Sequence, residues 1–241
     1  IDAFIAVSRS VEGQLLDNGV PAERISVVHD AVDVEEYSSP RESSYVRKEL
    51  AIPPDARVFG LLGRITGWKG VREFVTAASR VLEDMDDAYA LVVGDESDES
   101  PSYFRDVREL AARSPASERI IFTGYRDDVP EVMQELDLLV HASTSPEPFG
   151  LVLVEAMAAG TPVVAADRGG PLDIVADGET GILVNPEDPD ALAGAIARVL
   201  RSPRLARQMG DRGQRRARSH FDIDRYARDV TAVYREVSGA E

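Results

Sequence analysis

Short apolar runs alternate with stretches of helical periodicity along most of the chain. Runs such as Val58–Leu62 and Ala88–Val93 are almost wholly apolar, as is typical of buried strands. The expected strands are 58–62, 88–93, 120–122, 138–140, 161–165 and 181–184. The expected helices are 71–84, 102–113, 129–135, 149–159, a short one around 172, and 189–200. This alternation predicts an α/β fold with a doubly wound, Rossmann-like parallel sheet, which binds ligands outside the carboxyl ends of its strands.

The start of the chain repeats the strand–helix–strand pattern on a smaller scale. Ser8 is a suitable N-cap, and Asn18-Gly19 is a suitable helix end. The elements expected before residue 57 are a strand at 3–7, a helix from Ser8 to about Asp17, a strand at 25–28, and a short helix at about 44–50 within the polar segment 34–56.

From 202 to 237 the pattern is helical and rich in arginine. An apolar stripe at helical spacing predicts a last helix that packs into the core through Phe221, Tyr226, Val230, Val233 and Tyr234. The arginines predict a solvated helix face, and the alternative is a patch for peripheral contact with a membrane or an acceptor. They are Arg198, Arg201, Arg204, Arg207, Arg212, Arg215, Arg216 and Arg218.

Composition excludes several classes of protein. The 241 residues include no cysteine, so disulfides and cysteine-based metal sites are excluded. No apolar run approaches the roughly 18 residues that span a bilayer, which favours a cytoplasmic location. The formal net charge of -16 argues against nucleic acid as a partner, because nucleic-acid binders need a basic footprint.

The densest motif lies between two glutamates, Glu147 and Glu155. A Pro-Phe-Gly turn follows Glu147 and opens the helix that carries Glu155 and ends at Gly160. A helix start offers free backbone N–H groups to an anion. The two carboxylates would repel that anion, so they are better suited to accept hydrogen bonds from hydroxyl groups on either side of it.

This motif resembles the Glu-x7-Glu motif of retaining GT-B glycosyltransferases, in particular family 4, also called group 1. Leu136–Ser143 before it and Gly160–Val164 after it agree with the resemblance. The resemblance implies the C-terminal, donor-binding half of a GT-B fold. Residues 1–38 would then be the hinge and closing segment of a missing N-terminal acceptor domain, and 39–241 the nucleotide-sugar-binding domain with its C-terminal helix. Family members commonly have Asn-Gly where this chain has Asp30-Ala31.

The loop Gly63–Gly70 places two cations, Arg64 and Lys69, between a strand and a helix. Arginine can bind two phosphate oxygens at once, whereas lysine acts as a point charge. Glycine at Gly63 permits a backbone shape that side chains would block. The resemblance gives Arg64 and Lys69 the donor diphosphate, and with Glu147 they are the candidate catalytic residues. The alternative is a solvent-exposed turn.

The remaining candidates would bind other parts of the donor. By resemblance, Glu155 accepts bonds from ribose hydroxyls and Glu147 from the transferred sugar. The alternatives are a buried glutamate for Glu155 and an acid favoured by the helix dipole for Glu147. Backbone N–H groups of Phe149, Gly150 and Leu151 would face the sugar or phosphate, and Tyr125 or Arg126 would flank the base. His141 is expected to be a packed core residue, and Gly169-Gly170 a turn.

We therefore expect retaining glycosyl transfer from a nucleotide-diphosphate sugar to an unknown acceptor, without a metal or other cofactor. Fixed donors aimed at the departing diphosphate would provide electrostatic catalysis. The alternative is a non-catalytic nucleotide-sugar-binding module that needs a separate acceptor domain or subunit. Glycoside hydrolysis also uses paired carboxylates, but it needs neither the two cations nor the helix start. A nucleotide-sugar 2-epimerase of GT-B fold is a further, minor alternative.

Overall fold

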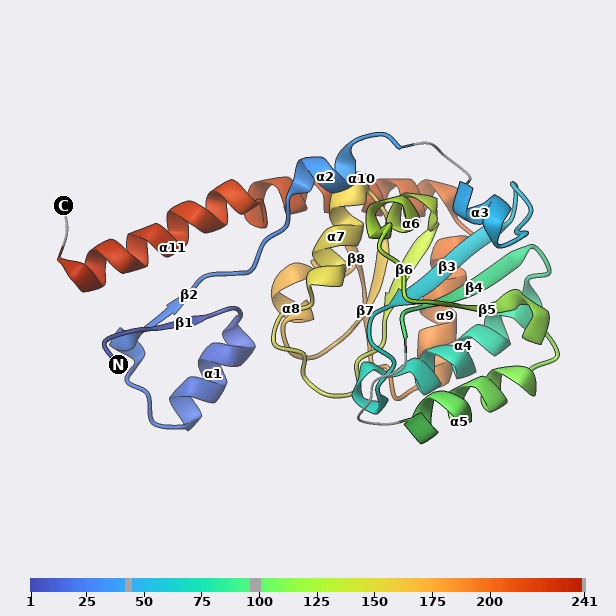
Figure 1. Cartoon of the computed structure of the whole chain (residues 1–241), viewed down its shortest axis with the longest axis horizontal. Helices are drawn as coiled ribbons and strands as arrows, with labels where there is room; N and C mark the ends of the chain where they lie inside the picture. The colour runs from blue at the N-terminus through green and yellow to red at the C-terminus, as the bar shows by residue number, and fades with distance from the viewer. Residues whose placement is uncertain (42–44, 96–100, 240–241) are drawn as a thin grey trace.

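The computed structural model describes residues 1–41, 45–95 and 101–239. A six-stranded sheet, parallel throughout, forms its centre, with strand order β5-β4-β3-β6-β7-β8 (Figure 1). The predicted doubly wound α/β fold is confirmed, and every strand expected from residue 58 onward is present. The strands are β3 (Arg57–Leu62), β4 (Ala88–Val93), β5 (Ile120–Gly124), β6 (Leu138–His141), β7 (Val163–Ala166) and β8 (Gly181–Val184).

Helices cover both faces of this sheet and bury alternate residues of each strand. On one face, Phe59 and Leu61 of β3 pack in a core with α4 (Val71–Asp84) and α9 (Pro189–Leu200). On the other face, Val58 and Leu62 pack in a core with helices that precede and follow β6. The helices of that second layer are α2 (Val34–Ser38), α6 (Val129–Glu135), α7 (Leu151–Ala159) and α10 (Pro203–His220). The helix α5 (Pro101–Ala112) packs beside α4.

The strand order reverses between β3 and β6. The chain runs outward from β3 to β5 and then returns to place β6 on the free side of β3. The connections that leave these two neighbouring strands lead to helices on opposite faces of the sheet, α4 after β3 and α7 after β6. Doubly wound sheets bind ligands at the carboxyl edge where this happens. Gly70 sets how closely the two loops approach, because a Cβ there would lie 1.7 Å from the carbonyl oxygen of Ala142.

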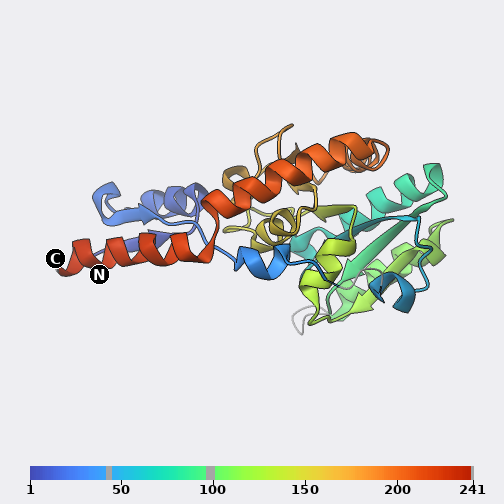
Figure 2. The ribbon, with the colours of Figure 1, turned by 90° about the horizontal axis from the view of Figure 1, so that it is seen from above.

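The first segment of the chain and its last helix project from the same end of the domain that holds the six-stranded sheet (Figures 1 and 2). The segment β1 (Phe4–Ala6), α1 (Arg9–Asp17) and β2 (Ile25–Val27) forms a separate two-stranded parallel sheet with its helix. The helix α11 (Ile223–Ser238) extends beyond the body beside this segment. Two backbone hydrogen bonds join the chain after β2 to the start of α11. The N–H of Val32 donates to the carbonyl of Phe221 at 3.0 Å, and the N–H of Ile223 donates to the carbonyl of Val32 at 3.1 Å.

Several expectations for the ends are wrong in detail. The C-terminal helix is interrupted at Phe221, and Asp222 caps a new helix through the N–H of Asp224. Phe221 is buried, but α11 has no buried residue and Tyr234 is 67% exposed, so its apolar stripe does not pack into the core. The predicted solvated face is confirmed for the arginines that the sequence singled out, except for Arg216, which is partly buried.

The helix α2 and the start of the motif helix also differ from the sequence interpretation, whereas the helix expected at about 44–50 is present. The short helix α2, capped by the Asp33 side chain, was not expected in the polar segment. The helix expected at 44–50 is α3 (Tyr45–Glu49), and residue 44 lies outside the described residues. The motif helix starts at Leu151, so Phe149 and Gly150 belong to the loop before it. Within the described ranges, no helix is both long and apolar enough to cross a membrane.

We predict that Gly70→Ala destabilises the fold by about 3 kcal/mol or more, because it adds a backbone clash to the cost of a left-handed conformation at φ 69°. Urea unfolding measures the change. Gly178→Ala is the matched control, since φ is 73° there with no atom within 4 Å of the added Cβ, and it should cost only about 1 kcal/mol. Equal losses for the two variants would contradict a close approach of the loops.

Candidate functional site

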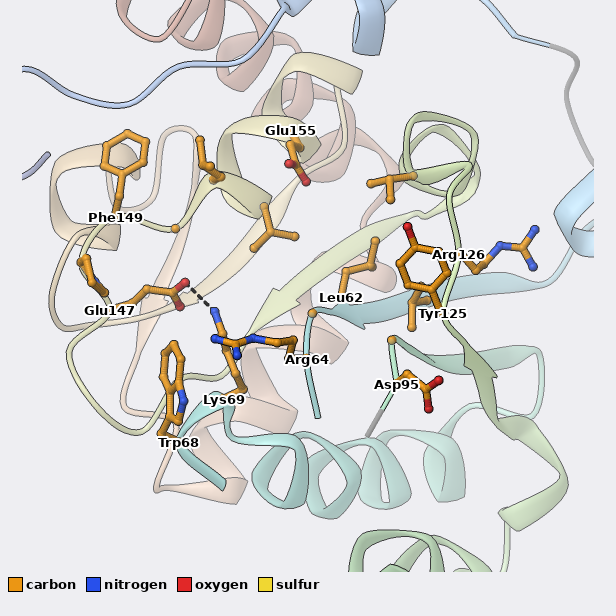
Figure 3. A pocket seen from close by; sticks show the side chains of 18 of the residues that line it. Leu62, Arg64, Trp68, Lys69, Asp95, Tyr125, Arg126, Glu147, Phe149 and Glu155 are labelled. Atoms are coloured by element: carbon orange, nitrogen blue, oxygen red, sulfur yellow. Dashed lines mark hydrogen bonds and ion pairs between the residues drawn. The ribbon is translucent and has the colours of Figure 1, made fainter. Parts of the chain in front are cut away.

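One pocket of 600 Å³ opens at the carboxyl edge of the sheet, where the strand order reverses. Loops after β3, β4, β5 and β6 and the start of α7 form its wall. The structure brings all the site residues predicted from the sequence to this wall, and Figure 3 shows most of their side chains. They are Gly63, Arg64, Lys69, Tyr125, Arg126, Glu147, Phe149, Gly150, Leu151 and Glu155.

A bond between Lys69 and Glu147 joins the β3 loop to the β6 loop. The Lys69 Nζ lies 2.5 Å from Oε1 of Glu147, and both side chains are mostly buried (Figure 3). The second oxygen, Oε2, lies 2.6 Å from Nε2 of His141 and accepts a hydrogen bond of 2.8 Å from Ser143. Both carboxylate oxygens of Glu147 therefore have partners before any ligand arrives.

These partners decide the ionisation of Glu147. Burial raises the pKa of its carboxyl, but the hydrogen bond and charge of His141 and the charge of Lys69 outweigh burial and lower the pKa to about 2. A carboxylate only accepts hydrogen bonds, so His141 must donate from Nε2. Among the described residues, the buried Nδ1 of His141 has no hydrogen-bond partner. His141 is thus buried as expected, but it is also a direct partner of the candidate site.

Arg64 and the start of α7 supply open hydrogen-bond donors. Arg64 is exposed at the pocket and makes no ion pair within residues 1–41, 45–95 and 101–239. No side chain caps α7, whose N-cap is Gly150 with φ 111°. The first amides of α7 lack intrahelical acceptors, so they are available to an anion in the pocket. A guanidinium and a helix amino end therefore face the same cavity.

Phe149 contributes backbone, not its ring, to this wall. Its ring is buried and stacks on His29 with centroids 5.9 Å apart, and it meets the ring of Phe221 at 5.8 Å. Figure 3 shows the ring directed away from the cavity. The turn before α7 is thereby held from behind, with its backbone toward the pocket.

Glu155 projects from α7 into the cavity (Figure 3). Burial raises the pKa of its carboxyl, a hydrogen bond from the hydroxyl of Tyr37 lowers it, and the nearby charge of Glu36 raises it further. Burial of the Tyr37 hydroxyl and the negative charge of Glu155 raise the pKa of Tyr37. Tyr37 lies on α2, the helix that the sequence did not predict. Glu155 is therefore a half-buried acceptor with one hydroxyl donor already in place.

The two residues proposed to flank a base differ from each other. Tyr125 is 76% exposed, so its ring can offer a face to a ligand. Arg126 touches the pocket, but its guanidinium is paired with both oxygens of Glu49, at 3.0 and 2.9 Å, and with Asp128. Asp128 also accepts a hydrogen bond from Tyr45. Arg126 thus joins α3 to the loop before α6 at the edge of the pocket, and a contact with a base is left to its aliphatic stem or to Tyr125.

Other pocket residues had no sequence signal or a weak one. Trp68 lies beside Lys69, whose Nζ is 4.4 Å from the ring centroid. Asp30 and Asp95 also line the pocket. Gly170 belongs to a turn, as expected, and donates its N–H to the carbonyl of Glu147 at 2.7 Å, so this turn supports the motif loop from outside the cavity. No group of three or more metal-binding side chains is arranged around a common point within the described residues.

Comparison with known proteins identifies the class. Residues 43–216 match the family model described as "Glycosyl transferases group 1", which is well over half of the chain. The chain therefore belongs to this family, and the resemblance that began from the Glu147 motif is confirmed.

Particular relatives agree with this class. The chain is 32% identical over 237 residues to the lipopolysaccharide core biosynthesis mannosyltransferase LpsB of Rhizobium meliloti, covering 97% of this chain and 65% of that protein. The crystal structure of Anabaena HepE in complex with UDP and glucose matches with a TM-score of 0.92 at 29% identity, covering 98% of this chain and 63% of that one. The C-terminal domain of LpcC, a group 1 family protein from Francisella tularensis, matches with a TM-score of 0.73 at 26% identity, covering 80% of this chain and 99% of that domain. The chain thus spans less than two thirds of the length of LpsB and HepE.

We predict that Glu147→Gln lowers the free energy of unfolding by about 3 kcal/mol at pH 7, because it leaves the buried Lys69 charge without its counter-charge. The folded pKa of about 2 lies below the usual 4.5, so the contribution is complete above pH 4.5 and is lost as the pH falls toward 2. By pH 3.5 the difference between the two proteins should shrink by about 1 kcal/mol.

Urea unfolding at both pH values measures this difference. Glu109→Gln is the control, because Glu109 pairs with Arg113 only on the surface, and its stability effect should be small at either pH. A difference for Glu147→Gln that grew on acidification would show that the carboxylate is not held by cations.

Proposed function

We propose that this chain is the donor-binding part of a retaining, family 4 glycosyltransferase that takes a sugar from a nucleotide-diphosphate sugar. The observation that carries the proposal is the convergence of Arg64, Lys69 and the amino end of α7 on one pocket. The printed names of the relatives support it, since LpsB is a mannosyltransferase and HepE was solved with UDP and glucose.

The diphosphate would lie between the two loops that Lys69 and Glu147 connect. An ammonium group has three donors, so Lys69 can keep its bond to Glu147 and still donate to a phosphate oxygen. Arg64 would bind further phosphate oxygens, and the amides at the start of α7 would complete the set. Negative charge grows on the diphosphate as the glycosidic bond breaks, and donors fixed in advance around it lower the barrier to that step.

The nucleoside and the sugar would extend in opposite directions from the diphosphate. Glu155 would accept hydrogen bonds from the ribose hydroxyls, while the exposed ring of Tyr125 would stack on the base. Glu147 would face the transferred sugar, with its orientation fixed by His141 and Ser143. Transfer with retention is supported by the resemblance of the Glu147–Glu155 motif, and a front-face attack assisted by the departing phosphate accords with it.

We predict that the wild-type chain binds at least one of UDP-glucose, GDP-mannose and ADP-glucose, together with the matching nucleoside diphosphate. Arg64→Ala should raise the Kd of that nucleoside diphosphate about 10-fold or more, because a charge-assisted hydrogen bond is lost. Isothermal titration calorimetry at one fixed salt concentration measures the change. Arg113→Ala, which removes an equally charged but surface side chain, is the matched control. An unchanged Kd in Arg64→Ala would place the diphosphate elsewhere.

The proposed ribose contact can be tested with a ligand that lacks the two ribose hydroxyl groups. The wild type should bind the nucleoside diphosphate about 10-fold more tightly than its 2′,3′-dideoxy analogue, since each hydroxyl donates to a charged acceptor. In Glu155→Ala this preference should disappear, so that the two ligands bind alike. Glu83→Ala, an exposed glutamate on α4, should keep the wild-type preference. A preference retained in Glu155→Ala would assign the ribose to another residue.

A further inference from the structure

Asp30 is a pocket residue that the proposed chemistry leaves unused. It comes from the segment between β2 and α2, whereas the other lining residues lie at Leu62 or beyond. Its carboxylate is partly buried, and within residues 1–41, 45–95 and 101–239 it makes neither a hydrogen bond nor an ion pair. Burial raises the pKa of Asp30, and the charge of His29 opposes this. A partly buried carboxylate without a bonded partner is costly, so its place in this cavity calls for a reason.

The backbone at Asp30 is fixed firmly. The neighbouring His29 stacks on Phe149 and lies 3.2 Å from a carboxylate oxygen of Asp173. Two residues later, Val32 exchanges backbone hydrogen bonds with the chain at Phe221. These contacts hold Asp30 against the turn that leads into α7. It therefore lies near the part of the pocket assigned to the diphosphate and sugar.

The charges of the pocket show what Asp30 does to its ligand. Lys69 is already paired with Glu147, and Arg126 is paired with Glu49 and Asp128. Among the described residues this leaves Arg64 as the lining cation without an acidic partner. An anion that enters the pocket thus meets one open guanidinium and the carboxylates of Glu155, on α7, and Asp30, near the α7 turn, neither of which makes an ion pair among the described residues. The pocket tolerates an anion, but each additional negative charge near Asp30 is penalised.

We propose that Asp30 makes the pocket prefer the nucleotide-sugar over the free nucleoside diphosphate that remains after transfer. This inference rests on the proposed function. In the sugar ester the terminal phosphate is esterified and cannot gain its second charge, and sugar hydroxyls can donate to the carboxylate. In the free diphosphate the terminal phosphate gains that charge above about pH 6 and loses the hydroxyl donors. Asp30 therefore binds the substrate side of the reaction and repels the product, which speeds product release.

The test compares two ligands in two variants. At pH 8, Kd is measured for one nucleotide-sugar and its free nucleoside diphosphate. The pair is UDP-glucose with UDP, GDP-mannose with GDP, or ADP-glucose with ADP, according to the base that the wild type selects. Asp30→Asn should lower the Kd of the free diphosphate, and the ratio of the two Kd values should shift about 10-fold in its favour. Asp55→Asn is the matched control, because Asp55 is exposed at the amino end of β3, the opposite edge of the sheet from the pocket.

The outcomes separate the two proposals. If the wild type binds neither ligand of any pair, the proposed function fails and this inference fails with it. If the wild type binds both ligands and the ratio in Asp30→Asn stays within about twofold of the wild type, the role of Asp30 is overturned while the donor site stands. If Asp30→Asn unfolds at a lower temperature than the wild type, the same ratio of Kd values is measured in Asp30→Ser, which also removes the charge. The same shift of the Kd ratio in Asp55→Asn would show that the effect comes from the net charge of the protein and not from the position of Asp30. This result would also overturn the proposal.

Discussion

The salt bridge between Lys69 and Glu147 holds the site together. A buried ammonium or carboxylate alone would cost several kcal/mol, so each residue makes the other tolerable in the interior. The bond crosses the one place in the sheet where neighbouring strands are followed by loops that diverge. Loops from β3 and β6 are far apart in sequence but leave adjacent strands, and this pair ties them together. Because His141 and Ser143 hold the other oxygen of Glu147, the orientation of the pair is set from the strand side as well.

The turn before α7 depends on residues from both ends of the chain. Phe149 buries its ring between His29 and Phe221, while Ser8 donates a hydrogen bond of 2.6 Å to the carbonyl of Pro148. A buried aromatic ring brings a large hydrophobic stabilisation, and here it also decides which side of the turn faces outward. The projecting first segment is thus attached to the motif loop by packing and hydrogen bonds. Displacing that segment would disturb the backbone that faces the pocket, so the segment and the site are mechanically coupled.

The sequence predicted the sheet and the composition of the pocket well, because both follow from local patterns. Apolar runs predict buried strands, and parallel strands bring the ends of their loops to one edge, so Lys69 and Glu147 could be placed at the same edge, but the bond between them was not predicted. The partners of Arg126 could not be predicted, because Glu49 reaches it across 77 positions of sequence through side-chain packing. Periodicity predicts that α11 is amphipathic, but it cannot show whether the apolar stripe packs against the rest of the chain. The helix α2 has five residues, too few for a period to be recognised.

Arg64 and Arg126 show why the number of cations around a pocket is a poor measure of its affinity for anions. Both line the same cavity, yet Arg126 directs its guanidinium into four hydrogen bonds with Glu49 and Asp128 and carries no net charge to a ligand. In a chain with a formal net charge of -16, acidic side chains can neutralise a cation beside a pocket, as Glu49 and Asp128 do for Arg126. Backbone N–H groups cannot be neutralised in this way, since their charge is a dipole fixed by the peptide geometry. The uncapped start of α7 therefore adds to Arg64 a set of donors that no acidic side chain can neutralise.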